Sequence, residues 1–124
     1  MGTERICNAT KEEWLPVRAR RCDSFLCRLR GLTFRRHLGA EEALLLVGEK
    51  EGRLETGIHM FFVFFSIAAV WLDGEGRIVD AVIARPFRPF YLPSGPAKDV
   101  LEGPPSLMRK VSKGDVLRFE REPE

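Results

Sequence analysis

The sequence predicts an α+β domain that is mostly β, with a compact, partly closed barrel-like sheet and two short helices. Apolar runs rich in β-branched and aromatic residues recur between turns that contain glycine or proline. The chain has 124 residues, of which 44% are hydrophobic and 31% are charged. That length suits one domain, and that composition is typical of an ordinary globular protein.

Short strands are expected along most of the chain, each marked by alternation or by an apolar run of strand length. In order they are Arg5–Ala9, Leu15–Arg21, Glu42–Val47, Ile67–Leu72, Arg77–Ala84, Ala97–Glu102 and Val116–Glu120. The turn Asp73–Gly76 joins the fourth and fifth strands into a hairpin. A polar loop is expected over residues 48–56, and four prolines within residues 85–96 predict an irregular, extended stretch.

Two short helices complete the prediction. The first covers Asp23–Arg30, between residues that can cap it and Gly31, which can end it. Its apolar stripe would consist of Phe25, Leu26 and Leu29. The second covers Ser106–Val111, after a proline that suits a first helical turn. Residues 1–124 are expected to form a single domain, with residues 121–124 as an acidic tail.

Residues 57–72, GIHMFFVFFSIAAVWL, contain no formal charge. A membrane-spanning helix needs roughly 20 apolar residues, and this run is shorter and rich in residues that favour strands. We therefore interpret it as core strands that break or bend near Phe65 and Ser66, with the phenylalanines shielded by the rest of the chain. Attachment to a membrane surface through Phe61–Phe65 is an alternative that stays open.

The three cysteines, Cys7, Cys22 and Cys27, are an odd number, which does not suit a complete disulfide framework. We expect reduced thiols in a cytoplasmic protein, without a bound metal or a cofactor. The N-terminus is polar and lacks the apolar region of a signal peptide, which agrees with that location.

Charge is unevenly distributed although the net charge is only +2. Seven arginines and a single acid, Asp23, lie between Arg18 and Arg36. This pattern predicts either a solvated basic face or a surface for an anionic ligand or an acidic protein. Specific nucleic-acid binding is not expected, because no recognised motif accompanies the arginines.

No spacing in the chain matches a catalytic motif, so no catalytic residue is assigned and the prediction leans away from an enzyme. Arg28, Arg30, His59 and Glu102 are the candidate binding residues. One hypothesis is a non-catalytic binding or accessory module with a basic surface around the first three. The alternative is a small enzyme or small-ligand-binding protein with a cleft near His59 and Glu102.

Five segments occur in a characteristic order: RLRGL at 28–32, ALLL at 43–46, IHMFF at 58–62, WLDGEGRIV at 71–79 and KGDVL at 113–117. Over about residues 15–120 they make the chain resemble the domain of unknown function number 192 family of small bacterial and archaeal proteins. The resemblance implies a compact β-rich fold with short helices, a bacterial source and no stated activity. Members commonly carry Arg, Pro and Asp where this chain has Phe64, Ser66 and Ala68. If that Arg and Asp pair inside the fold of relatives, packing replaces the pair here.

Overall fold

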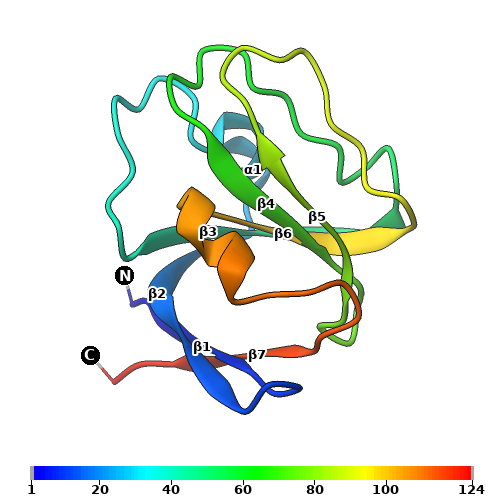
Figure 1. Cartoon of the computed structure of the whole chain (residues 1–124). Helices are drawn as coiled ribbons and strands as arrows, with labels where there is room; N and C mark the ends of the chain where they lie inside the picture. The colour runs from blue at the N-terminus through cyan, green and yellow to red at the C-terminus, as the bar shows by residue number, and fades with distance from the viewer. Residues whose placement is uncertain (1, 124) are drawn as a thin grey trace.

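Seven strands and two short helices make up the fold (Figure 1). The computed structural model describes residues 2–123, apart from the side chains of Phe25 and Leu29. The strands are β1 (Glu4–Asn8), β2 (Glu13–Cys22), β3 (Glu42–Gly52), β4 (Ile67–Leu72), β5 (Ile78–Ala84), β6 (Ala97–Gly103) and β7 (Leu117–Arg121). The helices are α1 (Phe25–Arg30) and the 3₁₀-helix η1 (Pro105–Arg109). The prediction of a mostly-β domain is therefore confirmed.

The strands form one sheet in the order β5-β4-β6-β3-β2-β1-β7. Only β2 and β3 pair in parallel, and α1 lies in the crossover that such a pair requires. β3 extends to Gly52, which pairs with Ala97 of β6, so part of the loop expected over residues 48–56 is strand. β6 is an interior strand of the sheet, between β4 and β3.

The sheet curls but is not closed into a barrel, which corrects that part of the prediction. Its edge strands, β5 and β7, meet at one end through an isolated bridge between Arg77 and Val116. There the amide of Ile78 donates to the carbonyl of Asp115 at 2.7 Å. The second helix is also shorter than expected and of 3₁₀ type, beginning at Pro105 and ending at Arg109.

Each face of the sheet carries its own apolar core. The first core lies beneath η1 and includes Leu101 and Leu107. The second lies beneath the long loops and includes Trp71 and Val100. Alternation explains the division, because consecutive residues of a strand point to opposite faces, as Val100 and Leu101 do.

The neutral stretch divides into a loop and a strand. Its second half is β4, which is buried along its whole length and pairs with β5 as the expected hairpin. Its first half, residues 57–66, is not a strand, and Phe61, Phe62 and Phe64 are each about half exposed. The expectation that the phenylalanines are shielded is therefore wrong. Smaller side chains of this loop, such as Met60 and Val63, fill the core instead.

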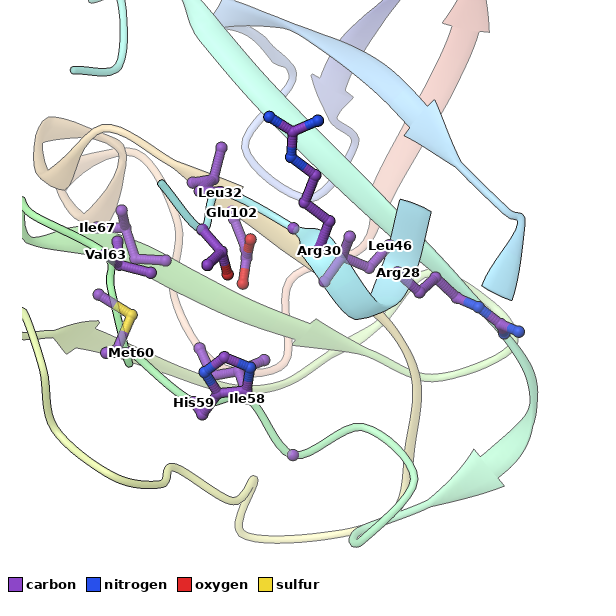
Figure 2. Close-up of a pocket in the computed structure, with 13 residues that line it drawn as sticks. Arg28, Arg30, Leu32, Leu46, Ile58, His59, Met60, Val63, Ile67 and Glu102 are labelled. Carbon is purple, nitrogen blue, oxygen red and sulfur yellow. The ribbon is translucent and has the colours of Figure 1, made fainter. Parts of the chain in front are cut away.

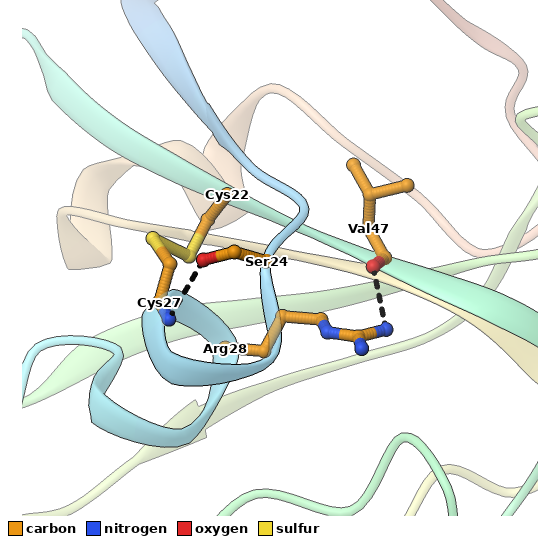
Figure 3. The surroundings of a disulfide bond; sticks show 5 residues. All are labelled: Cys22, Ser24, Cys27, Arg28 and Val47. Carbon is orange, nitrogen blue, oxygen red and sulfur yellow. Dashed lines mark hydrogen bonds between the residues drawn. A yellow bond between two sulfur atoms is a disulfide. The ribbon is translucent and has the colours of Figure 1, made fainter.

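The expectation of three reduced thiols is also wrong, because Cys22 and Cys27 form a disulfide. Cys22 ends β2, and the chain then turns directly into α1, whose first turn is capped by Ser24 (Figure 3). This turn brings the two Cα atoms to 5.5 Å, a normal disulfide separation. Cys7 remains a free, half-buried thiol.

Two further expectations change at the helix and at the C-terminus. Leu26 is exposed, so it does not belong to an apolar stripe, and the side chains of Phe25 and Leu29 lie outside the described residues. The predicted acidic tail is partly structured: β7 reaches Arg121, and Glu122 accepts a hydrogen bond from Thr3 at 2.7 Å. Glu124 lies outside the described residues. Across residues 2–123, no helix has the length and apolar character needed to cross a membrane.

Candidate ligand-binding site

A cavity of about 150 Å³ opens on the second core, between α1, β6 and the loop before β4 (Figure 2). All four residues proposed from the sequence, Arg28, Arg30, His59 and Glu102, line this cavity. A second cavity of about 350 Å³ adjoins it and shares four of its lining residues. The structure thus brings together residues that are more than 70 positions apart in the chain.

Glu102 lies on the interior strand β6, opposite Leu44 of β3 and Ala69 of β4. It lies two residues after Val100, so its side chain points to the same face, which is that of the second core. The short side chain of Ala69 leaves space beside it. Only 5% of Glu102 is exposed, which is unusual for a glutamate without a partner.

The carboxyl group of Glu102 points into the cavity, among Leu32, Val63 and Ile67 (Figure 2). Burial among these apolar side chains raises the pKa of Glu102 to about 7. Burial is the sole cause, and no described residue offers the carboxyl a hydrogen bond or an opposite charge. A buried carboxyl that lacks a partner and faces a cavity can receive a hydrogen bond or a positive charge from a ligand.

The two arginines line the cavity but do not direct their charges into it. Figure 2 shows both guanidinium groups pointing away from Glu102. Arg28 donates to the carbonyl of Val47 at 3.0 Å and lies 3.6 Å from a carboxylate oxygen of Glu49. These contacts hold its guanidinium toward Val47 and Glu49, away from Glu102.

The arginines between Arg18 and Arg36 are less available to bind an anionic partner than the sequence indicates. Three of them besides Arg28 form ion pairs with glutamates from elsewhere in the chain. The pairs are Arg18 with Glu122, Arg21 with Glu4, and Arg35 with Glu42. The continuous basic face considered from the sequence is therefore largely neutralised by acids that lie outside the arginine-rich segment.

His59 is exposed, and its imidazole ring lines the cavity together with the carboxyl of Glu102. Its Nδ1 accepts a hydrogen bond from the amide of Phe61 at 3.3 Å. A neutral imidazole that accepts at Nδ1 carries its proton on Nε2, which then remains a donor.

Two glycines that the sequence reading did not select shape the wall of the cavity. Gly31 has φ +50°, and a Cβ atom there would lie 3.6 Å from Oε1 of Glu102. A Cβ on Gly57 would lie only 2.7 Å from Cζ of Phe90, so glycine is needed for that ring to close over the loop. Gly31 could be recognised in the sequence as the residue that ends α1. No local sequence pattern indicated that Gly57 contacts Phe90.

The positions that differ from the family pattern do not lie together. Ala68 is fully buried in the first core, whereas Phe64 is about half exposed and packs on Phe87. In this chain the two side chains belong to different parts of the fold and do not pack against each other.

Solved structures share this fold. A putative transcription regulator from Sinorhizobium meliloti 1021 matches with a TM-score of 0.82, covering 95% of this chain and 92% of the other at 18% identity. A protein of unknown function from Novosphingobium aromaticivorans DSM 12444 matches with a TM-score of 0.78, covering 94% and 83%, also at 18% identity. At this identity the likeness shows the fold alone.

Relatives by sequence come from archaea of the genera Thermococcus and Pyrococcus. A UPF0127 protein of Thermococcus kodakarensis is 36% identical over 116 residues, which cover 92% of this chain and 72% of the relative. A UPF0127 protein of Pyrococcus furiosus is 32% identical over 118 residues, covering 94% and 98%. These relatives do not support the expected bacterial source. The family model DUF192, described as "Uncharacterized ACR", matches residues 6–119. The chain therefore belongs to the DUF192 family.

Proposed function

We propose that this protein is a binding module for a small organic molecule that carries an ammonium or a similar cationic group. Glu102 would receive the cationic group at the base of the cavity, and His59 would contact the ligand at its exposed side. Arg28 and Arg30 would contribute their aliphatic stems and backbone to the wall. The proposal retains all four candidate residues but reverses the sign of the ligand expected from the sequence.

The single observation that carries the proposal is the unpartnered carboxyl of Glu102, which is almost fully buried and aimed into a cavity. Buried ionisable groups are normally paired, and one without a partner at a cavity is a candidate for ligand binding. The raised pKa has the same origin, since burial disfavours the charged carboxylate. A cation in the cavity would stabilise the carboxylate and release the proton.

The size and lining of the cavity support a compact ligand. Cavities of about 150 Å³ hold a molecule as large as benzene, and the volume here is about 150 Å³. Apolar side chains, among them Leu32, Ile58 and Met60, form much of the wall. A larger ligand could extend into the adjoining cavity past Leu46, which lines both.

An anionic ligand suits the cavity less well than a cationic one. The nearest guanidinium groups point away, and that of Arg28 is bound to Val47 and Glu49. An anion would therefore meet the carboxyl of Glu102 without a compensating positive charge, which is unfavourable in a poorly solvated site.

Three probes of similar size and different charge test the proposal: benzylamine, benzyl alcohol and benzoate. Each is titrated into the isotopically labelled full chain at pH 8, and amide shifts of Gly31, Gly57 and Glu102 are followed by NMR. We expect affinity to decrease in the order benzylamine, benzyl alcohol, benzoate. Glu102→Gln should weaken benzylamine binding about tenfold or more, because a hydrogen bond to a charged group contributes about 1.5–3 kcal/mol.

Glu120→Gln is the matched control, since Glu120 is an exposed glutamate of β7 that does not line the cavity. It should bind benzylamine as the unmodified protein does. If benzoate binds most tightly, if none of the probes shifts these amides, or if Glu102→Gln binds benzylamine unchanged, the proposal is wrong.

A further inference from the structure

Three loops of unusual composition lie at one end of the molecule, and we call them the aromatic loops: residues 31–40, 57–66 and 85–96. Together they hold seven of the nine phenylalanines and four arginines. They contain no aspartate or glutamate, although the chain has 18 acidic residues. This separation of charge is independent of the cavity and calls for its own explanation.

Backbone hydrogen bonds join the aromatic loops into one surface. The amide of Phe34 donates to the carbonyl of Phe62 at 2.9 Å, and the amide of Phe87 donates to the carbonyl of Met60 at 2.8 Å. Figure 1 shows the three loops at the end of the molecule opposite β1 and β7. Each loop therefore presents its side chains on the same end of the protein.

Four phenylalanines of these loops form an exposed cluster. The rings of Phe34 and Phe62 stack with centroids 5.1 Å apart, and Phe87 contacts Phe62 at 6.3 Å and Phe64 at 5.5 Å. Yet Phe34 is 63% exposed and the other three are about half exposed. The cluster buries little apolar surface in the folded chain, so packing stability alone does not account for it.

Backbone geometry points to a role outside the core. Phe34, Phe62 and Phe87 have φ values of +67°, +57° and +62°. Bulky residues rarely adopt this left-handed conformation, and such strained residues concentrate at functional sites. Here the conformation turns three rings outward onto one surface.

We propose that the aromatic loops dock the protein onto an anionic lipid surface. Phenylalanine rings at loop tips can enter the boundary between head groups and acyl chains. Arg85 and Arg88 are exposed and lie on either side of Phe87 in the chain, where they can pair with lipid phosphates. The absence of acids in these loops removes the repulsion that an anionic membrane would otherwise exert.

Other occupants fit this surface less well. Single-stranded nucleic acid stacks its bases on free ring faces along a groove, whereas these rings pack against one another. A second copy of the chain, bound through the same surface, would bring arginines against arginines. Binding to an anionic lipid surface requires only protruding phenylalanine rings and positive charges beside them, and the aromatic loops have both.

The test is flotation of the full chain with vesicles of phosphatidylcholine alone and of phosphatidylcholine mixed with phosphatidylglycerol. We expect the protein to float with the mixed vesicles and to stay below with the neutral ones. Binding should weaken as salt is raised, because screening reduces the attraction of the arginines.

Two pairs of variants separate the contributions of rings and charges. Phe62→Ser with Phe87→Ser should abolish flotation, whereas Leu54→Ser should not change it, because Leu54 is a still more exposed apolar residue but lies outside the aromatic loops. Arg85→Gln with Arg88→Gln should weaken binding about 30-fold, given the usual contribution of an arginine near an anionic membrane. Arg118→Gln with Arg121→Gln, at the opposite end on β7, should have little effect.

A fluorescent reporter provides a second measurement, in which vesicle binding produces a signal and does not have to be abolished by a variant. In Trp14→Phe/Phe62→Trp, emission should shift to the blue when mixed vesicles are added and should not shift with neutral ones. Failure of the unmodified protein to float with mixed vesicles would overturn the proposal. Equal losses of flotation in the test and control variants would overturn it too. The same holds if the protein forms a dimer that Phe62→Ser/Phe87→Ser dissociates.

Discussion

At the scale of single residues, Glu102 is the group on which the proposed binding site depends. Its position on the interior strand β6 places a carboxyl in an apolar core, and the neighbouring cavity keeps that carboxyl in reach of a ligand. The other ionisable or charged side chains that line the cavity are His59, Arg28 and Arg30. Neither arginine faces the carboxyl, so burial alone sets its pKa.

The pKa of Glu102 predicts how stability depends on pH. The pKa of this carboxyl is ordinarily 4.5 and about 7 in the folded protein, so the folded protein keeps a proton that the unfolded chain has released between these pH values. The free energy of unfolding should therefore fall by about 3 kcal/mol as pH rises from 4.5 to above 7. Glu102→Gln should lack this loss and be the more stable protein at pH 8. Urea unfolding of both proteins across this range measures the difference.

Controls separate this effect from those of other titrating groups. Glu42→Gln should act with the opposite sign, because its ion pair with Arg35 lowers the pKa of Glu42 to about 2. The stability that Glu42 contributes is present above pH 4.5 and is lost as pH falls toward 2. His59→Asn removes the imidazole that lines the cavity. The loss of stability that Glu102 causes as pH rises should remain in this variant. Equal pH dependence in Glu102→Gln and in the unmodified protein would contradict the assigned pKa.

At the scale of elements, α1 is too short to be stable by itself. It has six residues, whereas isolated helices need about 12 or more to form in water. Its support comes from the Ser24 cap, the Cys22–Cys27 disulfide and the bond from Arg28 to the carbonyl of Val47 (Figure 3). These three attachments hold the helix that forms one wall of the cavity.

The presence of the disulfide can be tested directly by thiol titration. Thiol titration of the unfolded, unreduced protein should find one reactive thiol, that of Cys7, rather than three. Cys22→Ser/Cys27→Ser should lower the free energy of unfolding by about 2 kcal/mol, as expected when so short a loop is no longer closed. Cys7→Ser is the control and should not change the response of stability to a reducing agent. Three titratable thiols would show that the bond does not form.

At the scale of the whole molecule, the curled sheet depends on the junction between its two edge strands. Gly76 lies there with φ +84°, and its amide and carbonyl take part in the turn and the bridge to β7. A Cβ at this position would lie 2.5 Å from the carbonyl oxygen of Leu117, which is closer than two such atoms can approach. The junction can therefore form only with glycine at position 76.

Gly76→Ala should destabilise the protein more than Gly114→Ala. Both glycines have positive φ, so alanine at either position strains the backbone by about 1–2 kcal/mol. A Cβ at Gly114 meets nothing within 4 Å, whereas one at Gly76 must displace β7. We expect an additional loss of about 1–3 kcal/mol for Gly76→Ala in urea unfolding. Equal losses for the two variants would show that the contact with β7 does not support the fold.

Sequence alone determined the local elements of this protein. Leu15, Val17 and Ala19 alternate with polar residues and are all buried in β2, and the turn at Asp73–Gly76 joins the predicted hairpin. Such features depend on residues close together in the chain, whose periodicity directly reflects the geometry of a strand or a turn. The candidate residues at the cavity were also chosen from sequence, although their grouping there was not predictable.

Only the tertiary structure decided where long-range neighbours meet. It turned Phe34, Phe62 and Phe87 outward and paired three arginines of the basic segment with glutamates outside it. It left Glu102 without a partner among residues 2–123. It also closed the Cys22–Cys27 disulfide against the expectation from the cysteine count. Exposure, ion pairing and cavity shape depend on which segments pack together, and residue composition within one segment does not encode that choice.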